Sequence, residues 1–172
     1  MKLITPTIQY KTQYLDMLAD WERTGEKVVP FVLRYDTNDF DAFVDKLLGF
    51  QTVAEESFVC HSTFWLVNED DIIVGVSNLR HELNDKLLAG GGHIGFGIRP
   101  SYRKRGYATK ILELSLIEAQ KRDIEKALLT CDKINIASKK TILKNNGVFG
   151  EETLYKGMLV LKYWIDTKTK HL

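Results

Sequence analysis

A short basic stretch in the second half of the chain has the composition of an anion-binding turn. Arg103, Lys104 and Arg105 stand directly before Gly106, and apolar residues recur at helical spacing from Tyr107 onward. The first N–H groups of a helix lack intrahelical acceptors and carry partial positive charge, so a helix start can hold a phosphate. The glycine lets a ligand approach the backbone, and the three cations add charge-assisted contacts. The pattern favours a pyrophosphate site, although a solvated basic turn explains the same residues.

Alternating strand-like and helix-like segments surround this turn and would position it. Strand-like segments cover residues 1–5, 63–67, 72–79, 93–98, 126–131, 148–155 and 158–165. Helical spacing covers residues 14–21, 39–48, 107–121 and 135–145, with Asp39 as a cap and Gly49 as a stop. The order is β-α-α-β-β-β-α-β-α-β-β, which predicts a single α/β domain over residues 1–172.

The turn and the element order together resemble one known superfamily. Arg103-x-x-Gly106-x-Ala108 between a strand and a helix resembles the coenzyme A signature of the GNAT superfamily of N-acetyltransferases. The predicted order is also that of the superfamily over nearly the whole chain. Residues 79–84, 91–101 and 131–140 are similar to a branch of predicted bacterial acetyltransferases. The resemblance implies a mixed, mostly antiparallel central sheet whose central strands splay apart, with the acetyl thioester in the gap.

The resemblance also implies which residues hold acetyl-CoA, the acetyl donor. Backbone N–H groups of the turn would bind the pyrophosphate, and the strand before it would pair with the pantetheine amides. Asn135 matches an asparagine of the superfamily that contacts the cofactor, and it can also cap its own helix. Ser138 lies one helical turn onward and faces the same way. The implied set is Phe96, Gly97, Ile98, Arg103, Lys104, Arg105, Gly106, Tyr107, Ala108, Thr109, Asn135 and Ser138.

The catalytic residues are less constrained by the sequence. His93 is the first candidate for the general base, because it stands where some superfamily members have an acid and because histidine titrates near neutrality. A hydrogen-bonded structural histidine is the alternative, and His81 and Glu82 are weaker candidates. Many members use a tyrosine as the general acid, but Ile142 occupies the corresponding position here. The general acid that protonates the departing thiolate would then be Tyr155, another residue or water. Alternatively, the thiolate leaves without assistance.

The acceptor side is suggested by aromatic and acidic residues of the first two helices. Most of the aromatic ones are expected in the core, namely Tyr10, Tyr14, Trp21, Phe31, Phe40 and Phe43. Four acids make the same region suitable for a cationic amine, namely Asp36, Asp39, Asp41 and Asp45. We therefore expect transfer of an acetyl group to a primary amine of a small molecule or peptide, by direct attack in a ternary complex. A non-catalytic acyl-CoA-binding sensor or regulatory module is the alternative.

Composition narrows the remaining classes of function. The formal net charge is +1, so the protein as a whole does not attract nucleic acid or an anionic membrane electrostatically. The basic turn by itself is a weak candidate for a nucleic-acid contact. The sequence contains no run of ~18 apolar residues, so it predicts no membrane span. Cys60 and Cys131 form no CxxC pair, and the four histidines show no metal-binding spacing. We expect a cytoplasmic protein without a metal, and the final hairpin could form a homodimer by edge pairing.

Overall fold

The computed structural model, which describes residues 1–168, contains the strands and helices in the predicted order. The strands are β1 (Lys2–Ile4), β2 (His61–Val67), β3 (Ile73–Arg80), β4 (Ile94–Ile98), β5 (Lys126–Asp132), β6 (Val148–Tyr155) and β7 (Met158–Asp166). The α-helices are α1 (Lys11–Glu22), α2 (Phe40–Gly49), α3 (Tyr107–Gln120) and α4 (Ile136–Lys144). Among residues 1–168, no helix has the length and apolar composition needed to cross a bilayer.

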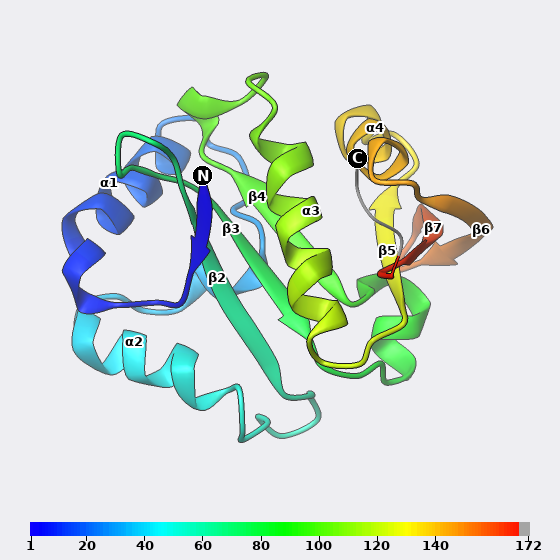
Figure 1. Cartoon of the computed structure of the whole chain (residues 1–172), viewed down its shortest axis with the longest axis horizontal. Helices are drawn as coiled ribbons and strands as arrows, with labels where there is room; N and C mark the ends of the chain where they lie inside the picture. The colour runs from blue at the N-terminus through cyan, green and yellow to red at the C-terminus, as the bar shows by residue number, and fades with distance from the viewer. Residues whose placement is uncertain (169–172) are drawn as a thin grey trace.

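The strands form two antiparallel sheets that separate in the middle of the fold. The first has the order β1-β2-β3-β4 and the second the order β5-β7-β6 (Figure 1). Strands β4 and β5 are neighbours without pairing as a ladder, which confirms the predicted splaying of the central strands. One edge of β4 is therefore bonded to β3, and its other edge faces a gap.

Helices cover both faces of the first sheet, so its central strands are buried throughout. Trp65 and Val67 of β2 pack with side chains of α1 and α2, whereas the alternate residues Phe64 and Leu66 pack with residues of α3. The predicted Asp39 cap is confirmed, because its carboxylate accepts a hydrogen bond from the Ala42 N–H at 3.0 Å. These contacts fix α3, and with it the basic turn, against β3 and β4.

Several short helical turns were not predicted and lie in the connections. They are η1 (Ile8–Tyr10), η2 (Phe31–Arg34), η3 (Leu87–Gly91) and η4 (Pro100–Tyr102). The expected polar connection between β3 and β4 contains η3, which closes on Gly92 at a φ of 65°. A side chain at Gly92 would overlap the Leu128 carbonyl oxygen, with Cβ only 2.6 Å from it. This close approach brings the start of β4 against β5.

Strand β6 is one of the two outer strands of the second sheet, and within residues 1–168 it pairs with β7 alone. Val148, Phe149 and Leu154 on this strand are exposed, in keeping with the surface position expected for the final hairpin.

Candidate functional site

Two adjoining cavities occupy the region where β4 and β5 separate. The larger has a volume of about 690 Å³ and runs along the basic turn, the start of α3 and one face of α4. The smaller has a volume of about 330 Å³ and lies between η2, β4, β5 and α4. Val29, Phe96, Asn135 and Ser138 line both, so the cavities meet at the open edge of β4.

The larger cavity collects the residues that the sequence assigned to a cofactor. Of that predicted set, every residue except Arg105 lines it. Phe96 to Ile98 reach it from β4, the turn and the first residues of α3 form one end, and Asn135 and Ser138 come from the start of α4. Asn135 also caps α4 as predicted, because its Oδ1 accepts a hydrogen bond from the Ser138 N–H at 3.0 Å.

The turn before α3 presents unbonded backbone amides to this cavity. Lys104 and Gly106 adopt left-handed φ values of 62° and 85°. Lys110 is the first residue of the helix whose N–H bonds to the preceding backbone, at 3.2 Å from Gly106 O. Within residues 1–168, no backbone carbonyl accepts from the amides of residues 104–109, and Gly106 has no side chain with which to cap the helix. A Cβ at Gly106 would meet no atom within 4 Å, so the approach to these amides is open.

The two arginines of the turn hold its shape, and the neighbouring lysines remain unpaired. Arg103 forms an ion pair with Glu26 at 2.7 Å and donates from Nε to the Ile98 carbonyl at 3.3 Å. Arg105 turns away from the cavity, donates to the Ser101 carbonyl at 3.1 Å and lies over the Tyr102 ring. Its side chain therefore lies outside the cavity, while its backbone N–H is one of the unbonded amides of the turn. The lysines that line the cavity have no ion pair within residues 1–168, namely Lys27, Lys104 and Lys144.

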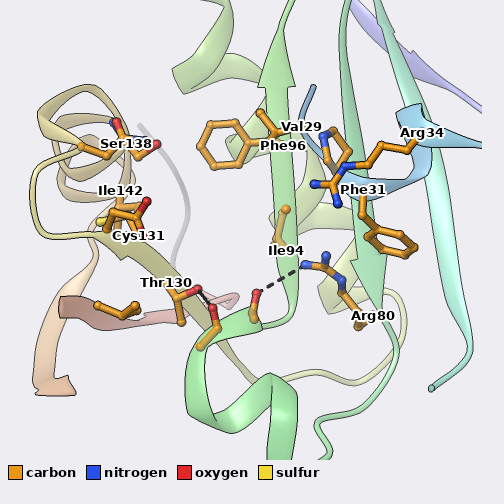
Figure 2. Close-up of a pocket in the computed structure, with 17 residues that line it drawn as sticks. Val29, Phe31, Arg34, Arg80, Ile94, Phe96, Thr130, Cys131, Ser138 and Ile142 are labelled. Atoms are coloured by element: carbon orange, nitrogen blue, oxygen red, sulfur yellow. Dashed lines mark hydrogen bonds between the residues drawn. The ribbon is translucent and has the colours of Figure 1, made fainter. Parts of the chain in front are cut away.

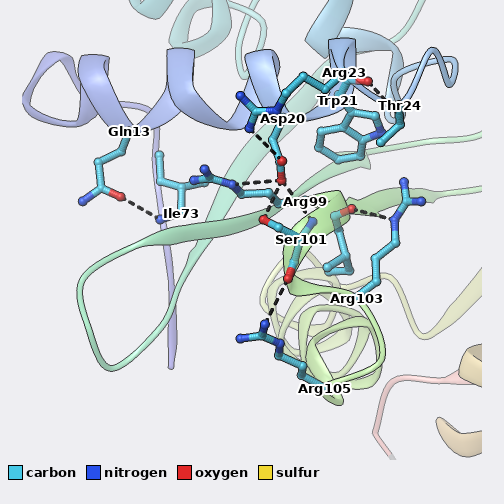
Figure 3. Close-up of polar contacts among 11 residues, drawn as sticks. Gln13, Asp20, Trp21, Arg23, Thr24, Ile73, Arg99, Ser101, Arg103 and Arg105 are labelled. Atoms are coloured by element: carbon cyan, nitrogen blue, oxygen red, sulfur yellow. Dashed lines mark hydrogen bonds and ion pairs between the residues drawn. The ribbon is translucent and has the colours of Figure 1, made fainter.

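A buried carboxylate on α1 anchors the segment that leads into the turn. Asp20 accepts hydrogen bonds from the Ser101 hydroxyl at 2.6 Å and the Ser101 N–H at 3.0 Å (Figure 3). Arg99 and Arg23 donate to the same carboxylate at 3.3 and 2.9 Å. Burial acts to raise the pKa of Asp20, but the hydrogen bonds from Ser101, Arg23 and Arg99 outweigh it and lower the pKa. Asp20 thus stays ionised and ties η4 to α1.

The smaller cavity carries charges that the sequence did not single out. Arg80, at the end of β3, and Arg34, on η2, extend into the region beside β4, opposite Thr130, Cys131 and Ile142 (Figure 2). Asp132 at the end of β5 is, among the described residues, the carboxylate lining this cavity. In the sequence, Arg80 and Asp132 are single charged residues at the ends of apolar strands. That pattern is common at ordinary strand ends, so it did not indicate a binding site.

The two predicted catalytic residues lie outside both cavities. His93 is 7% exposed, and its Nδ1 accepts a hydrogen bond from the Leu128 N–H at 2.9 Å, an arrangement that favours the structural alternative. Burial, followed by the charge of Arg80, lowers the pKa of His93 to about 4. Tyr155 packs against Gly90 of η3, where a Cβ at Gly90 would overlap its ring. Ile142 is buried and lines the smaller cavity.

Most of the weaker catalytic candidates and of the residues expected to bind the acceptor also lie outside the two cavities. His81 bonds to the Ser62 hydroxyl at 2.8 Å and, like Glu82, lines neither cavity. Tyr14, Phe40 and Phe43 belong to the core, as expected. Trp21 also belongs to that core, as expected, and borders the larger cavity. Tyr10 and Phe31 pack partly buried against the core, and Phe31 borders the smaller cavity. The four acids expected to attract a cationic acceptor line neither cavity, namely Asp36, Asp39, Asp41 and Asp45.

Comparison with solved structures finds the same fold in several acetyltransferases. A mutant of the spermidine N-acetyltransferase SpeG from Vibrio cholerae aligns with a TM-score of 0.63 at 13% identity, covering 97% of this chain and 95% of that one. An acetyltransferase from Salmonella typhimurium that modifies the N-terminal serine of a 50S ribosomal protein aligns with a TM-score of 0.68 at 11% identity, covering 95% and 93%. The self-immunity acetyltransferase MccE, in complex with acetyl-CoA and AMP, aligns with a TM-score of 0.69 at 12% identity, covering 95% and 91%.

Sequence comparison supplies the family. A search of curated proteins found no match. The model of the acetyltransferase (GNAT) domain matches residues 2–148, which is most of the chain. The structural neighbours above share this fold over nearly their full length. The chain therefore belongs to the GNAT acetyltransferase family.

Proposed function

We propose that this protein transfers the acetyl group of acetyl-CoA to a primary amine of a small molecule or peptide, by direct attack in a ternary complex. The observation that carries the proposal is the run of unbonded amides over residues 104–109, which opens into a cavity that continues to the gap between β4 and β5. Amides at a helix start suit a pyrophosphate, and an unpaired strand edge suits the amides of a pantetheine arm.

The residues of the larger cavity fit the parts of such a ligand. The amides and the ammonium groups of Lys104 and Lys144 would hold the phosphates. Phe96 to Ile98 pair with β3 on one edge only, which leaves the backbone groups of the other edge for the pantetheine amides. The reacting end would then lie beside Phe96, Asn135 and Ser138, where the two cavities meet.

The smaller cavity would admit the amine to the same point. Bound acetyl-CoA supplies the activated acetyl group, and the new N–C bond forms as the C–S bond breaks. Backbone N–H groups on the open edge of β4 would stabilise negative charge on the carbonyl oxygen. A base must take the proton of the attacking nitrogen, and we assign this step to the carboxylate of Asp132, which lines the smaller cavity. His93 and Tyr155 do not face this space.

The coenzyme site is tested by two substitutions of Gly106. Gly106→Ala adds a methyl group in open space and the cost of a left-handed residue, about 1 kcal/mol. Gly106→Glu adds the same strain and a carboxylate where the phosphates would lie. Titration calorimetry with coenzyme A should show a dissociation constant at least about 100-fold weaker for the Glu variant and only a few-fold weaker for the Ala variant. Equal affinity of the Glu variant and the wild type would refute the site.

A sensor that binds acyl-CoA without turnover is the second candidate function. It is favoured by one observation, the buried Ile142 in the smaller cavity at the position where many family members have a tyrosine. Incubation with acetyl-CoA and a panel of amines, with detection of free thiol, separates the two functions. A sensor should release no coenzyme A above the rate of the amine-free control.

A further inference from the structure

The smaller cavity contains a buried cation without a counter-ion. Arg80 is 7% exposed, and none of the carboxylates in residues 1–168 lies within ion-pair distance of it. Its NH1 donates to the Gly91 carbonyl in a long hydrogen bond of 3.4 Å, and its buried Nε has no partner. A buried charge is costly unless it is paired, so this guanidinium lacks the anion that would compensate its burial.

The guanidinium of Arg80 is held at the wall of the cavity. It lies against Gly95 of β4, where an added Cβ would be 3.0 Å from the Arg80 NH1 atom. The guanidinium carbon of Arg80 also lies 5.5 Å from the centre of the Phe31 ring. Gly95, Phe31 and Arg80 all line the smaller cavity. Burial lowers the pKa of Arg80 to about 10, so the group still carries its charge at neutral pH.

A second arginine lines the same cavity. Arg34 is exposed, and it has no ion pair within the described part of the chain. Its side chain and that of Arg80 reach toward the same side of β4 in Figure 2. Two guanidinium groups form a strong site for a carboxylate, because each can donate two hydrogen bonds in a planar arrangement.

We propose that the acceptor is a small primary amine that also carries a carboxylate, which Arg80 and Arg34 bind while Asp132 faces the amine. This inference rests on the proposed acetyl transfer and specifies its substrate class. The cavity volume of about 330 Å³ suits an acceptor of amino-acid size. It replaces the cationic acceptor expected from the acids of the first two helices, since those acids lie outside the cavity.

Matched acceptors test the substrate class directly. Each amino acid of a panel, including β-alanine and other ω-amino acids, is compared with its own carboxamide, and spermidine serves as a cationic amine without a carboxylate. The amine of a carboxamide is the less basic and so the more available as a neutral nucleophile, which makes the comparison conservative. We expect kcat/KM for the best amino acid to exceed that for its amide by about 10-fold or more. Equal rates within the pairs, or preference for spermidine, would overturn the proposal.

Substitution of the arginine tests the assignment to the site. Arg80→Met keeps much of the side-chain volume, and replacement of a buried charge by an apolar group is often tolerated by the fold. It should lower kcat/KM about 100-fold for the preferred amino acid and less than about 3-fold for its amide. Lys121→Met, which removes one positive charge outside both cavities, should change neither value. An equal loss on both acceptors in Arg80→Met would contradict carboxylate recognition.

Two further measurements distinguish failure of the acceptor proposal from failure of the proposed acetyl transfer. Arg34→Gln alters an exposed side chain, so it should fold normally and raise KM for the amino acid with little change in kcat. Calorimetry with coenzyme A reports on the proposed function independently of the acceptor. If coenzyme A binds but no carboxylate-bearing amine releases thiol, the inference fails and the coenzyme site stands. If coenzyme A does not bind, the proposed function itself fails.

Discussion

The N–H of Leu128 donates to the Nδ1 atom of the His93 ring at 2.9 Å, and the N–H of His93 donates to the Leu128 carbonyl at 2.7 Å. This reciprocal pair joins the residue just before β4 to the middle of β5. Beyond it the two strands do not form a ladder, and the cavities open between them. The pair therefore lies where the separation of the two sheets begins.

Loss of the His93 ring should affect stability more than chemistry. His93→Ala leaves the buried Leu128 N–H without an acceptor, which should cost about 2 kcal/mol in the free energy of unfolding. His93→Asn places an acceptor at a similar distance from the backbone and should recover much of that loss. Urea denaturation measures both values, and the thiol-release assay measures kcat. A large fall in kcat for His93→Asn with unchanged stability would restore His93 as a catalytic candidate.

The protein should lose stability between pH 6.5 and pH 4. Burial, followed by the charge of Arg80, lowers the pKa of both His61 and His93 to about 4, whereas an unfolded histidine titrates near 6.5. In this window the unfolded chain binds more protons than the folded one, so the free energy of unfolding falls as the pH falls. At pH 5 each histidine should account for a loss of about 2 kcal/mol.

Urea denaturation at pH 7.5 and pH 5 measures this loss. The His93→Asn variant cannot protonate at that position, so its loss between the two pH values should be about 2 kcal/mol smaller than that of the wild type. A loss of the same size in the variant would show that His93 does not contribute to the pH dependence.

Removal of the Asp20 carboxylate should loosen the turn before α3, the proposed coenzyme A site, from a distance. Asp20→Ala removes the acceptor of both Ser101 hydrogen bonds and leaves Arg99, whose side chain is 15% exposed, without its ion pair. We expect a loss of about 3 kcal/mol in unfolding free energy and a several-fold weaker dissociation constant for coenzyme A. Asp16→Ala, on the exposed side of the same helix, is the matched control. Calorimetry that gives equal affinities for the two variants would contradict the anchoring role.

Gly97 should tolerate no side chain, because the loop before η2 crosses directly over it. A Cβ at Gly97 would overlap the carbonyl of Val29, and Val29 lines both cavities. Gly97→Ala should therefore displace this loop, cost about 2 kcal/mol and weaken coenzyme A binding. Gly49→Ala is the control, since its Cβ would meet no atom within 4 Å. Thermal melts and coenzyme titrations of the two variants measure the difference.

Local signals in the sequence were sufficient to predict the strands, the α-helices and the turn that is proposed to bind coenzyme A. Helical spacing, the Asp39 cap and the strand-like runs depend on contacts within a few residues, and the structure contains each of them. The Arg103 to Gly106 turn was predicted for the same reason, because a helix start exposes its amides whatever surrounds it. The direction of the Arg105 side chain could not be predicted, since it depends on Ser101 and the Tyr102 ring.

By itself, the sequence determined the order of strands and helices and the position of the basic, glycine-containing turn before α3, which follow from short-range periodicity and spacing. The motif in that turn and the element order also carried the resemblance to the GNAT superfamily. Only the tertiary structure decided that His93 joins the start of β4 to β5, that Arg103 pairs with Glu26, and that Arg80 is buried with no carboxylate of residues 1–168 paired to it. These roles depend on which distant segments lie beside each side chain. Burial by those segments sets the free energy of a charged group, and the residue type alone does not reveal it.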